Sequence, residues 1–502
     1  MCLVCGNLHH QPPPAAQAVL QAALAAPVTV STISFSAPVP QAAINAIATQ
    51  LAYGYWESHN QSWGKFALQP GVALTVDISG LTEAAKATAL LALDSWTQTT
   101  GIRFNTDLTA GGQARITIDD SYSGAFTSRE MAGTVIQTAQ VNVSADWIAA
   151  YGGGVGSYGL QSFIHEIGHA LGLGHAGNYN GVVSFAPDAA LARDSWQTSV
   201  MSYFSQAQNP ASAASYAFVA GPMPADILAM QWLYGAAPVQ SGNTTYGVGS
   251  TGGAVQTAIG AMMADGTLPA PVCFTIVDRG GFDSLNLSTD RSNQAINLTP
   301  GTASSIYGLT GNLLIERLSV IEQVLAGQGH DLLQGNAAAN LLFGNAGNDR
   351  INGAAGDDRL FGGAGQDLLS GAEGQNRLYG GAGQDRLVSS TGTDSLNGGQ
   401  GADVFAFSAL AAGSVSGGAT AGRDTICDFQ HGIDRIDLRA LGAAGAVFQL
   451  VGSAAFSGSQ QLQIIQTPGG SLIRAEVTGD EGADFELFIS HGSALTAADF
   501  ML

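Results

Sequence analysis

The sequence is poor in positive charge and in cysteine. Its 502 residues include 17 Lys and Arg against 38 Asp and Glu, which gives a net charge of −21. This balance argues against nucleic acid as a partner, because phosphate binding needs a basic surface, and it suits a chain that binds cations. The four cysteines are too few to form a disulfide framework.

Long apolar runs are missing as well. No stretch reaches the roughly 20 uninterrupted apolar residues of a membrane helix, so we expect no transmembrane segment. No Lys or Arg occurs before Lys65, and without a basic segment near the start we expect no cleavable N-terminal secretory signal.

Residues 1–50 are rich in Ala, Pro and Gln, and we interpret them as a leader or prosegment with room for one short helix.

From residue 51 to residue 240 the composition is that of a globular domain. Apolar residues recur at helical spacing between Leu81 and Gly101, with Thr82 placed to cap the helix and Gly101 to end it. Alternating residues predict short strands within 101–107, 113–120 and 139–147. The glycine-rich stretch YGGGVGSYG then leads into FIHEIGHALGLGH.

Three histidines and one glutamate are the only ionisable groups in FIHEIGHALGLGH. On a helix, His165 and His169 lie one turn apart on the same face, where two imidazoles hold a divalent ion at little ordering cost. Gly172 allows the chain to end the helix and turn back, which brings His175 to the same side as a third ligand. Three neutral imidazoles leave a position open, as catalytic zinc requires. Glu166 is then placed to take a proton from a zinc-bound water and to pass it to the leaving amine.

The plainest alternative is that these histidines only fill space. A single buried histidine is usually of that kind, but three at this spacing, with the glutamate in second place, favour the metal site. The segment Gly154–Gly159 also fits the GxGxxG pattern of dinucleotide sites. No strand precedes it, and Tyr179 stands where an acidic residue is needed, so we interpret it as a loop that enters the zinc helix.

Residues 326–406 form nine consecutive rows of nine residues without an insertion. The eighth position is apolar in every row, from Leu333 to Phe405. Each row predicts a six-residue turn and a three-residue strand whose eighth side chain points inward, and the stacked rows predict a parallel β-roll. Glycines let backbone carbonyls approach a cation, and aspartates in the sixth position add the carboxylate oxygens that Ca²⁺ prefers. The predicted calcium ligands of the rows are Asp331, Asp349, Asp358, Asp367, Asp385, Asp394 and Asp403.

Some rows depart from this pattern. Asn340 and Asn376 take the sixth position in two of them, and these rows, with the row that begins Ser389-Ser390, are expected to bind calcium weakly or not at all. Without calcium the aspartates repel one another, and we expect the block to be disordered. A flexible glycine-rich linker is the alternative, but a linker has no reason to keep an apolar residue at every ninth place.

The motif from His165 to His175 matches the zinc signature of the metzincins, and the chain resembles their serralysin branch from about residue 50 to its end. The resemblance implies that Met201, in SVMSYF, is the Met-turn residue beneath the zinc. It also implies that Tyr203 is an additional zinc ligand that can swing to the transition-state oxyanion. The family's Pro-Gly-Asp-Tyr-Asn is replaced here by residues 176–180, AGNYN, a departure that touches no expected metal ligand.

The resemblance also implies the fold class: an α/β metzincin catalytic domain at residues 51–240, followed by an all-β domain with a parallel β-roll at residues 241–502. Two further calcium loops are implied at the ends of the roll. Asp278 and Asp283 belong to the first, and Asp424 and Asp434 to the second. Solvated acidic turns are the competing interpretation of both.

The C-terminal Asp-Phe-Met-Leu, residues 499–502, resembles the ending that bacterial type I secretion systems recognise. With the rows and no N-terminal signal, it indicates secretion to the extracellular medium, where calcium binding would fold the roll. Three interpretations of Cys2 and Cys5 with His9 and His10 stay open: a small metal site, a thiolate that keeps the zinc site latent, and incidental leader sequence.

Together these features imply a secreted, monomeric endopeptidase that uses zinc and calcium and acts on extracellular proteins or peptides. Its implied partners are its substrates, the type I secretion apparatus and, as a further candidate, a proteinaceous inhibitor. The alternative function is a calcium-dependent surface or adhesion protein with a vestigial zinc site. The intact Glu166 and the three intact histidines argue against that alternative.

Overall fold

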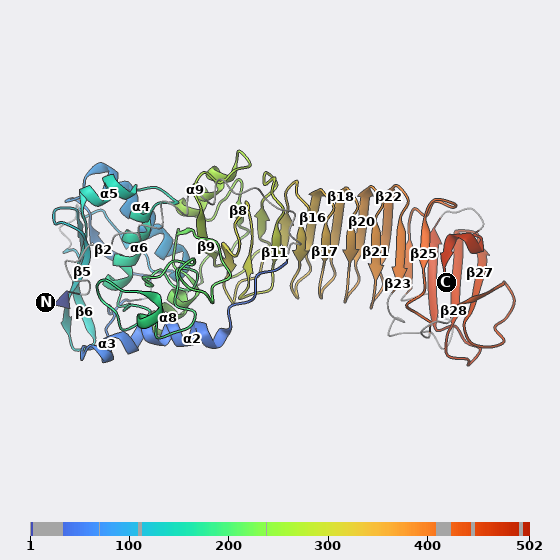
Figure 1. Cartoon of the computed structure of the whole chain (residues 1–502), viewed down its shortest axis with the longest axis horizontal. Coiled ribbons are helices and arrows are strands. Elements are labelled where there is room, and N and C mark those ends of the chain that lie inside the picture. The colour runs from blue at the N-terminus through green and yellow to red at the C-terminus, as the bar shows by residue number, and fades with distance from the viewer. Residues whose placement is uncertain are drawn as a thin grey trace. The chain divides into compact units, whose positions relative to one another are not determined.

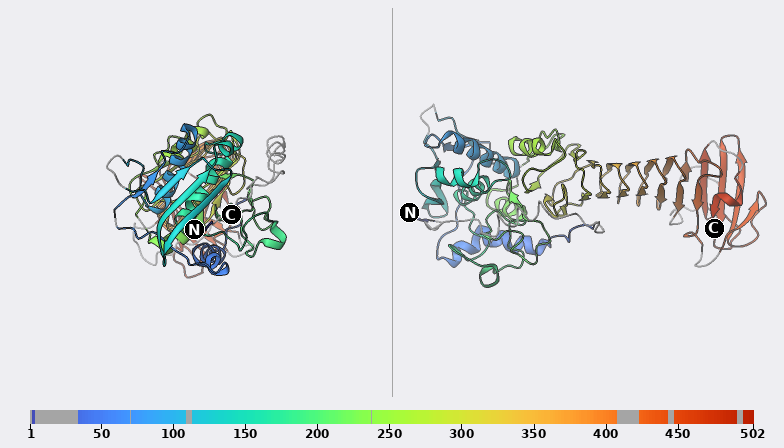
Figure 2. Two further views of the ribbon diagram at one scale, coloured as in Figure 1. Left: turned by 90° about the vertical axis from the view of Figure 1, so that its left-hand side faces the viewer. Right: turned by 45° about the horizontal axis from the view of Figure 1, so that its top comes forward.

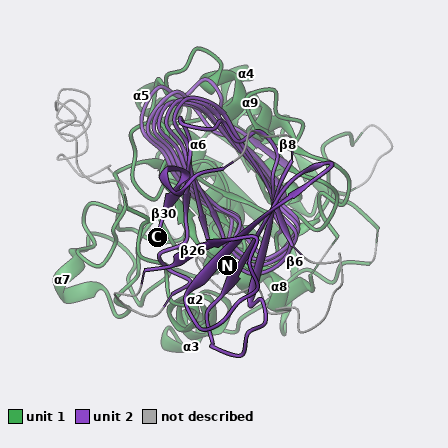
Figure 3. Cartoon of the chain, turned by 90° about the vertical axis from the view of Figure 1, so that its right-hand side faces the viewer, with its two compact units in different colours: residues 1–283, 300–319 green, residues 284–299, 320–502 purple. Residues whose placement is uncertain are grey.

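The computed structural model describes residues 2–3, 34–69, 71–108, 113–236, 238–407, 423–442, 447–490 and 495–502. The chain divides into two compact units: residues 1–283 with 300–319 form unit 1, and residues 284–299 with 320–502 form unit 2 (Figure 3). Cys5, His9 and His10 lie outside the described residues. No helix in the described part of the chain is long and apolar enough to cross a membrane.

Unit 1 contains a six-stranded sheet in the order β1-β5-β6-β4-β2-β3. Strand β5 is antiparallel to β1 and β6, and the other neighbours are parallel. Alternate residues of β4 and β6, such as Ile116, Ile118 and Val141, are fully buried, as the two-residue period of a strand dictates. The strands are β1 (Cys2–Leu3), β2 (Leu74–Asp77), β3 (Phe104–Asn105), β4 (Ile116–Asp119), β5 (Ala125–Ala132) and β6 (Val135–Val143).

Helices pack against this sheet. Helix α6 lies on β5 and β6, and α4 packs on α6 (Figure 1). The Trp96 indole of α4 donates to the Ile164 carbonyl of α6 at 3.0 Å, which fixes the two helices to each other. The helices are α2 (Gln41–Thr49), α3 (Tyr55–Ser58), α4 (Glu83–Thr100), α5 (Ala145–Tyr151), α6 (Tyr158–Ala170), α7 (Phe185–Asp188), α8 (Pro224–Tyr234) and α9 (Ala254–Met263), with a π-helical turn at Gln50–Gly54.

The local predictions hold with two corrections. The predicted helix is α4, which begins after Thr82 and ends at Gly101, but the Thr82 side chain makes no capping hydrogen bond. Residues 144–147 were predicted to continue a strand, but β6 ends at Val143 and α5 follows. The reason is a helix cap: the Ser144 hydroxyl accepts a hydrogen bond from the Trp147 amide at 3.2 Å. Because a helix rather than a strand precedes the GxGxxG segment, its interpretation as a loop is confirmed.

The boundaries of unit 1 differ from the expected 51–240. Helix α2 packs on α8 with Ile44, Ile47 and Ala48 buried, so part of the expected leader belongs to the core. At the other end the unit extends to residue 283, because β9 pairs with strands on both sides of it. These strands form a second sheet of β12 (Ala303–Ser304), β13 (Leu313–Ile315), β9 (Val272–Ile276) and β7 (Phe218–Val219). Strand β8 (Thr245–Gly247) falls between β7 and β9 in the sequence but is not part of this sheet.

Unit 2 contains the predicted parallel β-roll, which is followed by antiparallel strands between residues 461 and 490. Successive rows alternate between two parallel sheets, so each strand pairs with the strand 18 residues away, as Leu342 does with Leu360 (Figure 2). The strand of every row includes its last three positions, and the eighth side chain of every row is buried. In one of the two sheets the strands are longer than predicted: those that begin at Leu341, Arg359, Arg377 and Ser395 continue over the first three residues of the next row, where a turn was expected. The expected α/β domain followed by a β-roll is thus confirmed.

One sheet of unit 2 comprises β11 (Ala295–Asn297), β15 (Leu332–Gln334), β17 (Arg350–Asn352), β19 (Leu368–Ser370), β21 (Arg386–Ser389), β23 (Val404–Phe407), β25 (Arg435–Asp437) and β30 (Phe500–Met501). The other comprises β10 (Ser284–Asn286), β14 (Gln323–Leu325), β16 (Leu341–Ala346), β18 (Arg359–Ala364), β20 (Arg377–Ala382), β22 (Ser395–Gln400), β24 (Asp424–Ile426), β29 (Phe485–Ser490), β28 (Gly470–Glu476), β27 (Gln461–Thr467) and β26 (Gln449–Gly452).

Candidate active site

Three imidazoles converge at the end of α6. His165 and His169 lie on the helix, and His175 follows the turn after it. All three side chains are buried, and one nitrogen of each lies within 4.8 Å of the others. The Nε2 atoms of His169 and His175 are 3.0 Å apart. The structure therefore brings together the three histidines that the sequence singled out.

The other nitrogen of each ring faces a backbone carbonyl. The three contacts are His165 Nδ1 to Val200 O (2.9 Å), His169 Nδ1 to Leu173 O (2.8 Å) and His175 Nδ1 to Tyr179 O (2.8 Å). Because a carbonyl only accepts, Nδ1 carries the hydrogen, and the Nε2 of each neutral ring presents a lone pair. Burial also lowers the pKa of His165 to about 4. Lone pairs this close repel unless a cation lies among them, so the donor set fits zinc.

The turn that delivers His175 requires glycine. Gly172 has a φ of 114°, and a Cβ there would lie 2.2 Å from the carbonyl oxygen of Gly64. The Trp56 indole donates to the Gly172 carbonyl at 3.0 Å and holds the turn in place. The sequence predicted the role of Gly172, but not that of Trp56.

Glu166 is 1% exposed and lies beside the histidines. The Thr127 hydroxyl, on β5, lies 2.8 Å from its Oε2 atom and 2.8 Å from its carbonyl oxygen. Thr127 thus fixes the carboxylate from the neighbouring strand. No signal in the sequence pointed to Thr127, because it is one of many threonines and lies 39 residues from Glu166.

Met201 lies beneath the zinc helix. It is fully buried, and a Cβ on Gly168 would approach its sulfur to 2.6 Å, so the helix and the methionine pack without space for a larger residue. Asp226 on α8 fixes this turn: it accepts from the Ser199 hydroxyl at 2.6 Å and from the Val200 amide at 2.7 Å. The position of Met201 agrees with the implied Met-turn.

The ring of Tyr203 packs edge-on against His175 and lies near His165. Its ring centroid lies 4.5 Å from that of His175 and 6.0 Å from that of His165. A cavity opens next to His165, Glu166 and Tyr203, and the rings of Tyr158 and Trp196 form part of its wall. The candidate catalytic groups therefore lie at the edge of a space that a ligand can enter.

The sixth-position aspartates form two ladders along unit 2. The backbone N–H of one donates to the Oδ1 of the next, as Asp349 does to Asp367 at 2.8 Å. Burial raises the pKa of Asp349 to about 8 and that of Asp358 to about 7. The second carboxylate oxygen, Oδ2, is buried without a hydrogen-bond partner in Asp349, Asp358, Asp367, Asp385 and Asp403.

Glycines leave room for a cation beside these oxygens. A Cβ on Gly362 would lie 2.3 Å from Asp367 Oδ2 and 2.6 Å from the Gly380 carbonyl oxygen. The first glycine of the row thus leaves a space lined by carboxylate and carbonyl oxygens, which fits Ca²⁺. In Asp331 and Asp394, by contrast, both carboxylate oxygens accept hydrogen bonds.

Asp424 and Asp434 extend the two ladders beyond the rows. Asp424 Oδ1 accepts from the Asp394 amide at 2.8 Å, and Asp434 Oδ1 accepts from the Asp403 amide at 3.0 Å. Both side chains are buried. The competing interpretation of this segment as a solvated acidic turn is therefore wrong.

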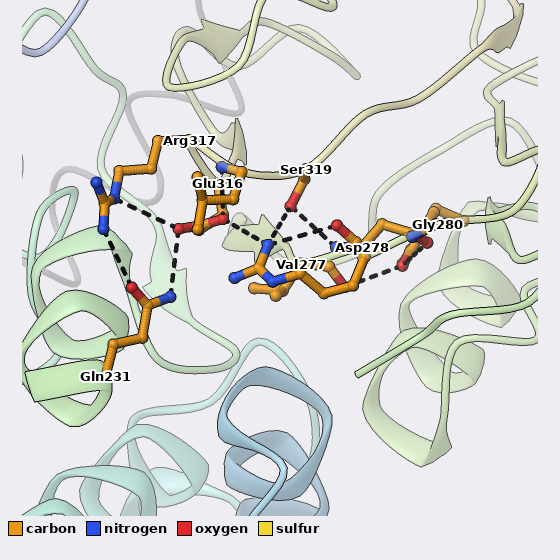
Figure 4. Close-up of polar contacts among 10 residues, drawn as sticks. Gln231, Val277, Asp278, Gly280, Glu316, Arg317 and Ser319 are labelled. Carbon is orange, nitrogen blue, oxygen red and sulfur yellow. Dashed lines mark hydrogen bonds and ion pairs between the residues drawn. The ribbon is translucent and has the colours of Figure 1, made fainter. Parts of the chain in front are cut away.

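Asp278 and Asp283, expected in the first flanking loop, are buried as well, so these two acids are not solvated, although residues 280–282 between them are exposed. Asp278 accepts from the Tyr246 hydroxyl at 2.8 Å and from the Gly280 amide at 3.0 Å. Its neighbour Arg279 forms an ion pair with Glu316 at 2.7 Å. Figure 4 shows Asp278, Ser319 and Glu316 in one group of polar contacts. The loop is thus anchored within unit 1.

Two family models match the chain. Residues 236–502, more than half of the chain, match the model described as Peptidase M10 serralysin C terminal. Residues 77–228 match Metallo-peptidase family M12B Reprolysin-like. These two matches cover the roll and the histidine site respectively.

Similar proteins include the Metalloprotease AprA of Pseudomonas entomophila (strain L48), which is 34% identical over 277 residues, 53% of this chain and 56% of that protein. Serralysin B of Dickeya chrysanthemi is 40% identical over 181 residues, 35% of this chain and 36% of its own. The matches thus span about half or less of these relatives. The solution structure of the AlgE6R3 subunit of the Azotobacter vinelandii mannuronan C5-epimerase is 27% identical, with a TM-score of 0.16, over 35% of this chain and 78% of that chain.

Proposed function

The chain belongs to the serralysin family of metallopeptidases, and on this premise we propose that it is a secreted, zinc-dependent endopeptidase that cleaves peptide bonds in extracellular proteins. The observation that carries the proposal is the convergence of three Nε2 atoms beside the buried carboxylate of Glu166. The relatives named metalloprotease and serralysin support the same reaction.

In this proposal His165, His169 and His175 hold the metal. When bound, zinc supplies Lewis acidity toward the scissile carbonyl and the attacking water. Glu166 takes a proton from that water at a carboxylate oxygen and delivers it to the leaving amine nitrogen. Thr127 keeps the carboxylate in place by its hydrogen bond to Oε2.

Two further residues complete the proposed site. Tyr203, next to His165 and His175, is placed to donate its hydroxyl to the oxyanion that forms on the substrate, and it is also proposed as an additional zinc ligand. Met201 supports α6 from below. The cavity beside Glu166 is the space for a substrate side chain.

We assign calcium to the roll. The buried Oδ2 atoms of five row aspartates, with the nearby carbonyls, are the proposed ligands, and Asp424 and Asp434 close the ladders. Calcium supplies the positive charge that these oxygens lack, so its binding free energy contributes to folding. We also propose that residues 499–502 direct secretion by a type I apparatus and that calcium drives folding of the roll outside the cell.

Casein hydrolysis by the zinc- and calcium-loaded chain tests the proposal. We expect cleavage that 1,10-phenanthroline abolishes and that Glu166→Gln lowers by at least ~10²-fold, because the general base is lost. Glu57→Gln removes the same charge at an exposed position and is the matched control. If the loaded wild type cleaves no protein substrate, the calcium-dependent surface protein with a vestigial zinc site takes the place of this function.

A further inference from the structure

Residues 496–502, here called the C-terminal segment, include the proposed secretion signal at 499–502 and are part of the fold of unit 2. Strand β30 pairs in parallel with β25, with Ile436 opposite Phe500. Strand β25 pairs in turn with β23, which contains the last three residues of the ninth row. Phe500 is buried, and Asp499 has no exposed surface. The C-terminal segment therefore continues a sheet that the strands of the rows form.

Asp499 accepts hydrogen bonds from two parts of the chain. Within the C-terminal segment, its Oδ2 atom accepts from the Thr496 amide at 2.7 Å and from the Thr496 hydroxyl at 3.1 Å. From another segment, His431 Nδ1 lies 2.9 Å from Oδ2, and the Gly432 amide donates to Oδ1 at 3.2 Å. Because an ionised carboxylate only accepts, Nδ1 of His431 carries the hydrogen. A buried carboxylate is costly without such donors, so the burial of Asp499 depends on His431 and Gly432.

These two donors belong to a loop, residues 428–434, that lies on the ninth row. The Asp428 carboxylate accepts from the Gly398 amide at 2.9 Å and from the Gly399 amide at 2.7 Å. The Gln430 side chain donates to the Gly399 carbonyl at 2.9 Å. The ninth row thus fixes the loop that supplies the donors to the C-terminal segment.

The ninth row also carries a proposed calcium ligand, Asp403. The Asp403 amide donates to Asp434 Oδ1 at 3.0 Å, and the Gln430 amide donates to Asp434 Oδ2 at 2.8 Å, so Asp434 links the row to the loop. Asp403 Oδ2 is buried without a hydrogen-bond partner, and a Cβ on Gly398 would lie 2.3 Å from it. The oxygen therefore faces the space at Gly398, whose amide donates to Asp428 of the loop. A cation in that space binds against backbone that the loop also contacts.

We propose that calcium in the last rows of the roll holds the C-terminal segment in place through the 428–434 loop, and that the proposed secretion signal is accessible only in the calcium-free chain. The inference rests on the proposed roles of calcium and of residues 499–502, and it gives them an order: secretion comes first, and calcium-driven folding then buries the signal. Coupling of this kind is reciprocal, so contact between the segment and the loop also raises the affinity of the ninth row for calcium.

Hydrogen exchange of the full-length chain at increasing calcium tests the coupling. We expect the amides of residues 496–502 to become protected over the same range of calcium concentration as those of the ninth row, 398–406. His431→Ala removes one donor to Asp499 and leaves every proposed calcium ligand intact; its side chain is 38% exposed, so the change does not disturb the core. At saturating calcium we expect exchange in 496–502 of this variant to be faster by roughly threefold or more, the effect of one lost hydrogen bond, while the ninth row stays protected.

Ile433→Ala is the matched control. Ile433 lies in the same loop and is 50% exposed, whereas the loop's bonds to Asp499 come from His431 and Gly432, so exchange in this variant should equal that of the wild type. By reciprocity, the His431 variant should also need about twofold more calcium to protect the ninth row, and the Ile433 variant should not.

Three outcomes overturn the proposal: equal exchange of residues 496–502 in the wild type and in His431→Ala, protection of these residues in a calcium chelator, or protection of the ninth row alone when calcium is added. If calcium changes the exchange of neither segment, the calcium assignment of the roll fails as well. None of these readouts uses secretion or casein hydrolysis, so a failure of the proposed function is distinguished from a failure of this inference.

Discussion

The hydroxyl of Tyr179 donates to the buried carboxylate of Asp194, at 2.9 Å from Oδ2 and 3.1 Å from Oδ1. The carbonyl of the same tyrosine accepts from His175 Nδ1 at 2.8 Å, and the Tyr203 amide lies 3.4 Å from its hydroxyl. Tyr179 thus connects a candidate zinc ligand, the candidate oxyanion donor and a buried acid. Asp194 contacts the site through this tyrosine and through the side chain of Ser202.

We predict that this connection positions Tyr203. Tyr179→Phe removes the hydroxyl but keeps the carbonyl that orients His175, so zinc content should be unchanged while kcat falls by roughly 10-fold, since small misplacements of catalytic groups are costly. Asp194→Ala should lower kcat similarly with little change in KM. Asp194→Asn keeps an acceptor for the hydroxyl and should restore most of the rate. A full wild-type kcat in Asp194→Ala would contradict this role.

Thr127 should matter through its hydroxyl. Thr127→Val keeps the shape of the side chain but removes the donor to Glu166, and we expect kcat to fall by roughly 10-fold because the general base loses its fixed orientation. Thr127→Ser keeps the hydroxyl and should stay within about threefold of the wild type. Steady-state peptide cleavage compares the two, and equal rates would show that the hydrogen bond is dispensable.

Gly168→Ala should loosen the contact between α6 and Met201. The added Cβ would lie 2.6 Å from the Met201 sulfur and 3.1 Å from the Trp96 ring, so we expect a loss of about 1–3 kcal/mol in the free energy of unfolding. Zinc should also dissociate more readily in competition with a chelator. Gly154→Ala meets no atom within 4 Å and is the control, expected to unfold at the wild-type temperature. Equal thermal stability of both variants would refute the close packing.

The calcium-free roll should be more stable in mild acid. Burial raises the pKa of Asp349 to about 8 and those of Asp331 and Asp358 to about 7, from an ordinary value of 3.8. The folded roll then binds more protons than the unfolded chain, so its stability is fully present below pH 3.8 and is lost as the pH rises to about 8.

Circular dichroism in a calcium chelator tests this prediction. The roll should contain more β-structure at pH 5 than at pH 8, where its ionised aspartates are expected to leave it disordered. With saturating calcium the order should weaken or reverse, because calcium requires the ionised carboxylates. A calcium-free roll that is more stable at pH 8 than at pH 5 would show that the buried aspartates do not govern it.

The parts of the fold and of the site that could be predicted best are those with a periodic or regularly spaced sequence signal. The helical spacing of His165 and His169, the glycine at 172 and the nine-residue rows each fix local geometry, and the structure follows them. Thr127 and Asp194 could not be found in this way, because their contacts join distant segments and nothing in their neighbourhood repeats.

The boundaries of the two units could not be predicted from local sequence patterns either. Helix α2 belongs to unit 1 because Ile44 and Ile47 are buried with α8, a tertiary contact that composition does not reveal. Asp434 takes the ladder position after Asp403 although 31 residues separate them, so the nine-residue period no longer indicates which acid comes next. The hydrogen bond from the Asp403 amide, and not the distance along the sequence, determines the place of Asp434 in the ladder.

The alternation of rows between two sheets restricts how such a chain can lengthen or shorten. Gain or loss of a single nine-residue row would move every later strand to the opposite sheet and give it new neighbours. Two rows, or 18 residues, preserve all later pairings. Duplications tolerated during evolution should therefore come in even numbers, and an engineered roll should be built from double rows.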